Sequence, residues 1–343
     1  MADATTITVP EDARTVVLHN HVKAGRPWWF WLMLTLLLLS LLAVGVLLAT
    51  VGSLLSGQSD AGSVVERYES GGRLSADKVA IIEIVGTIMP PFTAGQIQKI
   101  EHARDDEAVK AVLLRVDSPG GFVADSHQIY HKLRELSAEK PVYVSFGRIA
   151  ASGGYYVAMG AGPEGKIFVE PTTWTGSIGV IIPRYEAKDL AAKVGVDVEP
   201  LVTGPHKDAL SPFKDLDGEE RAIWDSILAD AFEQFKTVIK DGRPLSEAEI
   251  DAVATGRIFT AKQALAENLV DETGFEEDAV AALAEAAGLT DPKVVRYASP
   301  PSALDLLLGV RSDPPSPATM LGKALTPAPY YLFGWPTTAL ATQ

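Results

Sequence analysis

One serine of this chain is placed where a nucleophile could act. Ser152 lies within Gly147–Tyr156, which we expect to be a turn of small residues directly after the apolar, strand-like run Pro141–Phe146. A serine hydroxyl is nearly inert at neutral pH, so it attacks a carbonyl only when a base takes its proton and fixed donors stabilise the oxyanion. Gly153 and Gly154 leave room for a substrate carbonyl, and the Gly153 N–H is a candidate oxyanion donor. Because Ser-Gly-Gly is also common in ordinary loops, this motif alone does not identify a nucleophile, and a second sequence element must support it.

The second element is a pair of glycines upstream. The run Ala111–Val116 predicts a buried strand that leads into Asp117–Gly121, and Val123–Leu136 has a helical pattern. Glycines at the end of a strand expose backbone N–H groups, so Gly120 or Gly121 could supply another oxyanion donor. Ligands of open α/β folds bind beyond the carboxyl ends of the strands, and we expect both glycine turns there.

The general base is harder to find. Histidine is the usual base near neutral pH, but none of the six histidines lies between Ser152 and His206. His127 and His131 are one turn apart on the predicted helix and could ligate a metal. No matching cysteine or carboxylate cluster supports them, so we expect a solvated helix face and no metal site.

Lys207 is the alternative base. It lies in the polar loop Thr203–Pro212, which follows the strand-like run Val198–Val202. Burial can lower the pKa of a lysine by about 3 units, which brings a large fraction of it into the basic form near neutral pH. Without burial, a lysine in this loop would be an ordinary surface residue.

Together these residues resemble the signal peptide peptidase SppA family of membrane-anchored bacterial serine proteases. The resemblance covers about Lys78 to Gly274. Its five segments, in the family's order, are Asp117–Gly121, Ala151–Tyr156, Thr175–Val180, His206–Asp208, and Gly256–Thr260 continuing to Gly274. The resemblance implies an α/β fold shared with the caseinolytic proteases and crotonases, in which β-β-α units repeat in a superhelix.

The resemblance also implies the roles of individual residues. Ser152 would be the nucleophile, Lys207 the general base, and Ser177 the residue that holds the lysine by a hydrogen bond. Gly153, with Gly120 or Gly121, would supply the oxyanion N–H groups. In short members of the family the serine and the lysine of one site come from neighbouring subunits, so a homo-oligomer is implied. Its substrates would be peptides such as cleaved signal peptides, and no cofactor is implied.

The run Trp28–Leu55 predicts a transmembrane anchor. It contains no charged residue, and 28 residues at about 1.5 Å each give roughly 42 Å, enough to cross a hydrocarbon core of about 30 Å. Lys23 and Arg26 precede the run, whereas the nearest basic residue after it is Arg67. The positive-inside rule therefore predicts a cytoplasmic N-terminus, an extracytoplasmic catalytic domain and, for a bacterium, the inner membrane.

The charge distribution and the absence of cysteine narrow the function classes. Residues 1–27 contain three acidic and three basic side chains, so the whole net charge of −14 belongs to residues 56–343. An acidic domain argues against nucleic acid or anionic lipid headgroups as primary ligands. With no cysteine in the chain, disulfides, a thiolate nucleophile and cysteine-ligated zinc are all excluded.

Strand-like runs alternate with helical stretches from Val79 onward, which predicts an α/β domain. The expected segments are a cytoplasmic segment (1–27), an anchor (28–55), a linker (56–77), a peptidase domain (78–298) and a proline-rich tail (299–343).

Two further segments have open roles. Glu219–Lys240 is the longest amphipathic pattern, and we expect its apolar stripe to pack in the core rather than between subunits. The tail has eight prolines in 45 residues, and its aromatic group Tyr330–Trp335 suggests docking on a neighbouring subunit or on the membrane.

Two alternative functions belong to other classes. A crotonase-like acyl-CoA enzyme would use the same glycine turns, but it would also need basic residues for the CoA phosphates and access to cytoplasmic thioesters. A non-catalytic membrane scaffold would have no need of Ser152, Lys207 and Ser177 together. The leading hypothesis is a membrane-anchored serine endopeptidase.

Overall fold

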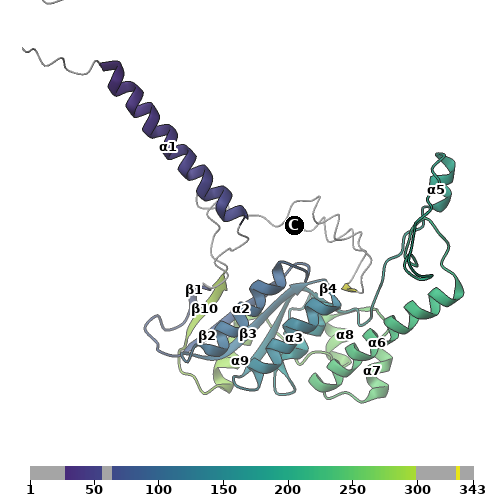
Figure 1. Ribbon diagram of the computed structural model, residues 1–343. Coiled ribbons are helices and arrows are strands. Elements are labelled where there is room, and N and C mark those ends of the chain that lie inside the picture. The colour runs from purple at the N-terminus through teal and green to yellow at the C-terminus, as the bar shows by residue number, and fades with distance from the viewer. Residues whose placement is uncertain (1–27, 56–63, 299–329, 333–343) are drawn as a thin grey trace, which may run out of the picture. The chain divides into compact units, whose positions relative to one another are not determined.

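The computed structural model describes residues 28–55, 64–298 and 330–332 (Figure 1). It divides into two compact units, Met1–Ser59 and Asp60–Gln343. The predicted cytoplasmic segment, residues 56–63 of the predicted linker and most of the predicted tail lie outside the described residues.

The first unit contains one helix, α1 (Trp28–Leu55), whose bounds are those predicted for the anchor. Its window Trp28–Val46 has a mean hydropathy of 2.3 and is long and apolar enough to cross a membrane. The hydroxyls of Thr35 and Ser40 donate to backbone carbonyls three or four residues earlier, so these polar groups are satisfied within the helix.

The second unit is built on a nine-stranded mixed sheet. Its main path runs through β1 (Val65–Ser70), β10 (Lys293–Ala298), β2 (Lys78–Val85), β3 (Val109–Ser118), β5 (Val142–Ala151), β6 (Ile167–Val169) and β9 (Glu272–Thr273). All neighbours on this path are parallel except β1 and β10. The α/β class is therefore confirmed.

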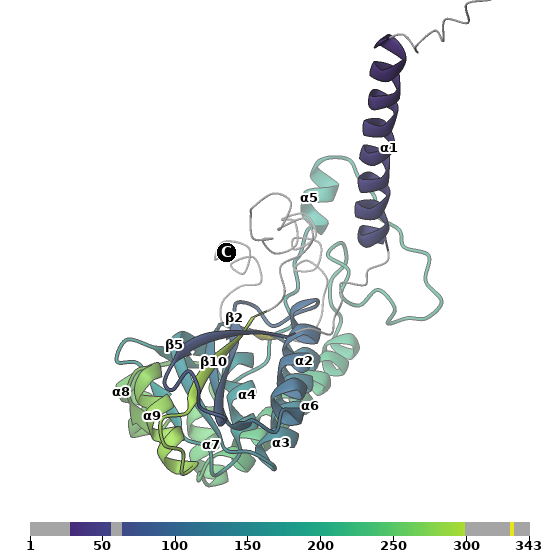
Figure 2. The same ribbon diagram turned by 90° about the vertical axis from the view of Figure 1, so that its left-hand side faces the viewer.

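Helices cover both faces of the sheet (Figures 1 and 2). Alternate strand residues point to opposite faces, so Ile82 and Leu114 pack in one core cluster while Ile81 and Leu113 pack in another. The first cluster includes residues of α2 (Phe92–Asp105), α3 (Val123–Ser137) and α4 (Gly153–Ala158), and the second includes residues of α9 (Glu276–Ala286). Strands buried on both faces read as continuous apolar runs, which is why the sequence predicted β2 and β3 correctly.

The strand β5 is long enough to pair twice. Its first part is parallel to β6 at Val144–Phe146, and its last part is parallel to β7 (Trp174–Gly176) at Ile149–Ala151. β7 in turn pairs antiparallel with β8 (Ile258–Thr260). A 3-10 helix and two short α-helices complete this region: Met159–Ala161, α7 (Glu247–Val253) and α8 (Ala261–Ala266).

A small second sheet pairs β4 (Gly120–Phe122) with β11 (Tyr330–Leu332). β4 follows β3 directly and precedes α3, so β3, β4 and α3 form one unit of the expected β-β-α order.

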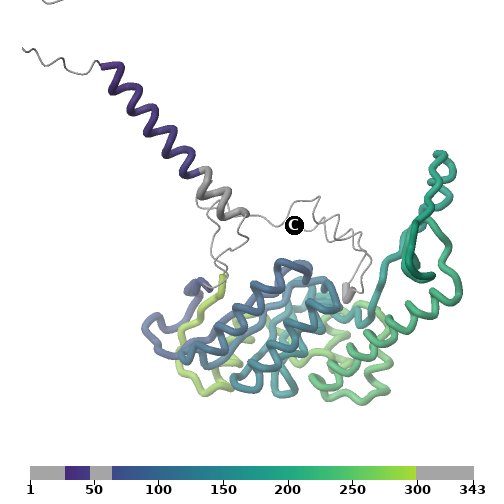
Figure 3. Tube along the Cα trace, in the orientation of Figure 1, coloured from purple at the N-terminus to yellow at the C-terminus, as the bar shows by residue number. Residues whose placement is uncertain are grey.

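An arm, defined here as residues 181–217, connects the β7 region to α6 (Gly218–Gly242). It carries the short helix α5 (Lys188–Lys193), which Figures 1 and 3 show well away from the sheet. Several of its apolar side chains are exposed: Leu190, Val194, Val196, Val198, Leu201 and Val202. A capping box of Asp217 and Glu220 begins α6 immediately after the arm.

Four sequence expectations need correction. Gly147–Ala151, predicted as a turn, is the end of β5, and the turn begins at Ser152. Val198–Val202 forms no strand, because Pro200 lacks an amide donor and the run is exposed without a partner strand. Residues 65–70 of the predicted linker form the edge strand β1.

The fourth correction concerns α6. Only its second half packs in the core, through Phe235, Val238 and Ile239. Ile223 and Ile227, on the stripe expected to be buried, are each 37% exposed. The sequence revealed an apolar stripe but not its partner.

We expect Gly154→Ala to destabilise the domain. A Cβ on Gly154 would lie 2.7 Å from the backbone oxygen of Ser118, so α4 or the end of β3 must shift, at a cost of about 1–3 kcal/mol. The matched control is Gly218→Ala, because a Cβ there meets nothing within 4 Å and its effect should stay within about 0.5 kcal/mol. Urea unfolding measures both, and equal effects would contradict the close packing.

Candidate active site

Ser152 lies at a strained turn between β5 and α4. Its φ of 54° falls in the left-handed region that non-glycine residues rarely adopt. Its N–H donates to the Gly176 carbonyl at 2.8 Å, and its carbonyl accepts from the Tyr156 N–H at 2.8 Å. The side chain is 1% exposed, and its Oγ has no hydrogen-bond partner among the described residues. Backbone strain that persists in a folded protein often marks a functional residue.

Ser177 occupies a similar turn at the end of the neighbouring strand. Ala151 pairs with Gly176, so Ser152 and Ser177 each follow one member of a parallel pair. Ser177 has a φ of 50°, is 7% exposed, and donates its N–H to the Arg257 carbonyl at 2.7 Å. The structure therefore brings together the predicted nucleophile and the predicted lysine-holding serine.

The glycine pair lies at the end of β3, which is parallel to β5 with Ser118 opposite Ala150. Gly120 has a φ of 101°, and its N–H donates to the Ser118 Oγ at 3.1 Å. Gly121 must be glycine for a different reason, because a Cβ there would lie 1.9 Å from the Ile88 carbonyl oxygen. Ser118 was not singled out from the sequence, although a hydroxyl two residues before a glycine is typical of a side-chain-stabilised turn.

Two buried tyrosines fix the helix that begins after Ser152. The Tyr155 hydroxyl donates to the Leu269 carbonyl at 2.8 Å, and the Tyr156 hydroxyl lies 2.7 Å from His127 Nδ1. Burial raises the pKa of both phenols, so they stay protonated. The sequence did not reveal this role, because buried tyrosines in a helix also occur in ordinary cores.

The predicted histidine pair is not a shared ligand set. His127 contacts Tyr156, and its pKa is lowered by burial and by the nearby His131. His131 Nε2 instead lies 3.1 Å from Glu135 Oε1. The two imidazoles therefore have separate partners.

Lys207 lies on the arm, in the turns that precede α6, and its side chain is exposed. Its N–H donates to the Gly204 carbonyl at 3.2 Å. Because the Ser152 Oγ has no partner among the described residues, this chain does not bring the Lys207 ammonium into hydrogen-bond contact with the serine.

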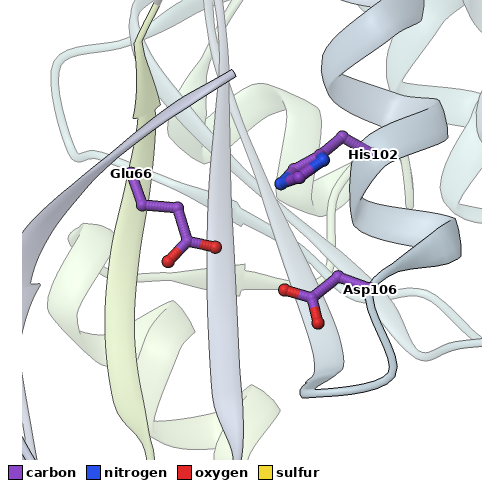
Figure 4. Close-up of side chains that lie close together, drawn as sticks. All are labelled: Glu66, His102 and Asp106. Atoms are coloured by element: carbon purple, nitrogen blue, oxygen red, sulfur yellow. The ribbon is translucent and has the colours of Figure 1, made fainter. Parts of the chain in front are cut away.

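A separate cluster of possible metal ligands lies at the other end of the sheet. Glu66, His102 and Asp106 place ligand atoms within 4.8 Å of one another, and Figure 4 shows their side chains converging from β1 and the end of α2. The Lys78 Nζ already donates to the Glu66 carboxylate at 2.7 and 3.0 Å and to Asp106 at 3.0 Å. The cluster is thus an ion-pair network in which two carboxylates share the Lys78 ammonium.

Comparisons with known proteins identify the family of the chain. A model of peptidase family S49 matches residues 134–290. A putative protease of Synechocystis is 42% identical over 217 residues, which are 63% of this chain and 77% of that protein. A putative signal peptide peptidase SppA of Enterococcus faecium is 37% identical over 203 residues, 59% of this chain and 57% of that protein.

A solved structure of a mutant 1510-N membrane-bound stomatin-specific protease covers 66% of this chain and 100% of its own chain. Its TM-score is 0.44 and its sequence identity is 17%, so it says nothing about individual residues.

A strained serine beside glycine turns at the carboxyl ends of parallel strands is typical of hydrolases that form an acyl-enzyme. The chain belongs to peptidase family S49, which confirms the resemblance to the SppA family and places the protein among the serine peptidases.

We expect Lys78→Met to destabilise the domain by about 1–3 kcal/mol at pH 7, because it leaves two carboxylates without their cation. Burial alone would raise the pKa of Asp106, but the Lys78 hydrogen bond and an Ala108 N–H hold it below its ordinary value. The stabilisation by the ionised Asp106 carboxylate is fully present above the ordinary pKa of an aspartate. It is lost as the pH falls through the lowered pKa of Asp106 in the folded protein. The difference between wild type and variant should therefore shrink from pH 7 to about pH 3.5.

Urea unfolding at both pH values is the measurement. Lys110→Met is the control, since Lys110 is exposed on β3 and has no ion pair among the described residues. An equal effect of the two substitutions, or a pH-independent difference, would contradict the network.

Proposed function

We propose that the protein is a membrane-anchored serine endopeptidase that hydrolyses cleaved signal peptides or other apolar, membrane-proximal peptides. Ser152 is the nucleophile, and Lys207 of a neighbouring copy is the general base. The observation that carries the proposal is the juxtaposition of two strained serines, Ser152 and Ser177, beside the glycine strand β4.

The proposed reaction has two stages. Ser152 Oγ attacks the scissile carbonyl carbon while its proton passes to the neutral lysine, and the resulting oxyanion accepts hydrogen bonds from the Gly153 N–H and from the glycine pair. The C–N bond then breaks, and the leaving amine takes the proton from the lysine. Water then attacks the carbonyl carbon of the acyl-enzyme while its proton passes to the neutral lysine. The C–Oγ bond breaks, and the lysine returns this proton to Ser152 Oγ. No cofactor is needed.

Between the two glycines of the pair, the contacts favour Gly121 as the donor. The Gly120 N–H is already hydrogen-bonded to the Ser118 Oγ, and that bond holds the turn in shape. The backbone of Gly121 is not engaged by Ser118, and its missing Cβ lets Ile88 approach closely.

Three observations support a lysine supplied by a neighbouring copy. Lys207 is exposed within its own chain, the arm that carries it presents apolar side chains such as the 98%-exposed Leu201, and Ile223 and Ile227 in the first half of α6 are also exposed. A cavity of about 690 Å³ lies between the arm and α6, lined among others by Arg184, Trp224 and Leu228. A second copy that covers these surfaces would bury apolar area and remove Lys207 from water, and desolvation favours the neutral amine.

The apolar helix α1 and the basic residues before it support a substrate class close to the membrane. The helix α1 would tether the domain where apolar peptides accumulate, and the positive-inside rule would place residues 1–27 in the cytoplasm of a bacterium and the peptidase domain outside.

The test is complementation between two inactive variants of the full chain in detergent. Ser152→Ala and Lys207→Ala should each hydrolyse a fluorogenic apolar peptide at less than about 1% of the wild-type rate. Mixed in equal amounts and allowed to exchange subunits, they should recover up to about a quarter of wild-type activity, because half the sites gain an intact serine and half of those an intact lysine.

The control mixes Ser152→Ala with the double variant Ser152→Ala/Lys207→Ala, which should stay inactive. Full activity of either single variant would refute the role of that residue. Inactivity of oligomeric wild type towards a broad peptide library would refute the peptidase proposal.

We expect Ser177→Ala to lower kcat by about 10- to 100-fold with little change in KM. The lysine becomes charged as it accepts the proton, and a hydrogen bond to a charged group contributes about 1.5–3 kcal/mol. Ser177→Gly distinguishes the effect of the hydroxyl from the effect of the strained backbone, because glycine lacks the hydroxyl but adopts a positive φ freely. Both variants should be equally slow in steady-state assays. Recovery of activity by the glycine variant would show that Ser177 acts through its backbone alone.

A further inference from the structure

The cluster of Glu66, His102 and Asp106, called here the β1–α2 cluster, combines three possible metal ligands. Figure 4 shows Glu66 reaching from β1 towards the two residues at the end of α2, and one ligand atom of each lies within 4.8 Å of the others. The cluster lies at the amino ends of β2 and β3, whereas Ser152 follows the carboxyl end of β5. Whatever the cluster binds is therefore independent of the proposed peptidase reaction.

The end of α2 holds two of the ligands in fixed positions. His102 and Asp106 are four residues apart, and the Asp106 N–H donates to the His102 carbonyl at 3.0 Å, so both side chains lie on one face of the helix end. The Ala108 N–H donates to Asp106 Oδ1 at 2.8 Å, while Oδ2 accepts from the Lys78 ammonium. Oδ2 is thus the Asp106 oxygen that a different cation could take over.

The β1–α2 cluster contains more negative charge than its present cation compensates. Lys78 Nζ donates to both oxygens of Glu66 and to Asp106. Two carboxylates that share one ammonium leave one negative charge uncompensated. The Lys78 side chain is 19% exposed, so its ammonium can return to water when another cation takes its place.

A buried hydroxyl beside the cluster lacks a partner. Tyr297 is 1% exposed, and its hydroxyl has no hydrogen-bond partner in the part of the chain that the structure describes. Tyr297 lies opposite Glu66 in the pairing of β10 with β1, and its ring packs against the His102 ring with 5.2 Å between the centroids. Burial and the charges of Glu66 and Asp106 raise its pKa, so both carboxylates are close to the hydroxyl. A buried hydroxyl without a partner points to a missing water or ion.

We propose that the β1–α2 cluster is a site for one divalent ion of the Zn²⁺ class, which displaces the Lys78 ammonium. Zn²⁺ accepts one imidazole nitrogen and two carboxylates, whereas Mg²⁺ and Ca²⁺ prefer oxygen ligands alone. Zinc bonds of about 2.0–2.2 Å place tetrahedral ligand atoms about 3.4 Å apart, so rotations of the three side chains are enough to close the site. The fourth position is open to water, which the Tyr297 hydroxyl is placed to hydrogen-bond.

The bound ion would cross-link the edge strand β1 to α2. Within the described residues β1 pairs only with β10, and the register of that pairing shifts between Tyr68 and Ser70. The ion would be held by Glu66 of β1 and by two residues at the end of α2, and it would therefore fix the strand from its other side. Because the site exists only in the folded domain, the ion also stabilises the fold.

The experiment titrates the full chain in detergent with Zn²⁺ alone, after dialysis against EDTA, and measures affinity by calorimetry. His102→Gln should weaken the site about 100-fold relative to wild type, because it removes one of three ligands, and Tyr297→Phe should weaken it about 10-fold. His131→Gln is the matched control. His131 also lies one turn before a carboxylate, that of Glu135 on α3, and its substitution should change the affinity by less than about twofold.

Lys78→Met tests the displacement of the ammonium. The variant removes the competing cation, so its affinity for Zn²⁺ should be about tenfold higher than that of wild type. Zn²⁺ should also restore the urea midpoint that the variant loses in EDTA, because the ion replaces the missing positive charge. Lys110→Met, on the exposed side of β3, should have the affinity of wild type.

Hydrogen exchange provides a readout that does not depend on affinity. The amides of residues 65–70 should exchange more slowly in wild type with Zn²⁺ than in EDTA, and His102→Gln should show no such difference.

Each outcome decides one part of the proposal. Equal affinities of wild type and His102→Gln would overturn the site. Binding by Lys78→Met but not by wild type would show that the ammonium is the permanent occupant, and it would overturn the site in the natural chain. Equal affinities of Lys78→Met and wild type would overturn the displacement. Binding without slower exchange at residues 65–70 would overturn the cross-link between β1 and α2.

Discussion

Parallel pairing of β3 with β5, and of β5 with β7, is the constraint on which the site depends. Because parallel strands end at the same edge, the pairing places the glycine strand, Ser152 and Ser177 side by side although they are distant in sequence. Helices on both faces of the sheet hold the register, since a slip of one residue would turn each buried side chain to the wrong face. Packing of the buried side chains therefore determines where the residues of the candidate site lie.

The same framework stabilises an unfavourable local geometry. A positive φ at a serine costs on the order of 1–3 kcal/mol, and the site contains two such residues. Backbone hydrogen bonds from the Ser152 N–H to Gly176 and from the Ser177 N–H to Arg257 offset part of this cost. The two acceptors lie at the end of β7 and immediately before β8, so the pairing of β5, β7 and β8 brings them to the strained turns.

Local patterns predicted the apolar helix α1, the parallel strands β2 and β3 and the turn at Ser152, because each is encoded in a short run: α1 in an uncharged apolar stretch, β2 and β3 in continuous apolar residues. Features that depend on distant partners were not predictable. The glycine and alanines at the end of β5 predicted a turn, because small residues are common in turns. In the structure, Gly147 lacks a side chain for another reason: Arg115 and Asp117 pack against it. The exposed stripe of α6 and the position of Lys207 depend on surfaces that the single chain leaves uncovered. β11 is a three-residue strand without periodicity, and only its register with β4 reveals it.

The antiparallel register of β11 on β4 also gives this edge of the glycine strand a polarity. An incoming strand that pairs with Gly121 in the same way must run from its N-terminus to its C-terminus against the direction of β4. Peptide bonds are not symmetrical, so a strand that ran the other way would place its N–H and carbonyl groups in a different pattern along Gly121. The backbone of β4 therefore distinguishes the two directions of an extended chain without any contribution from side chains.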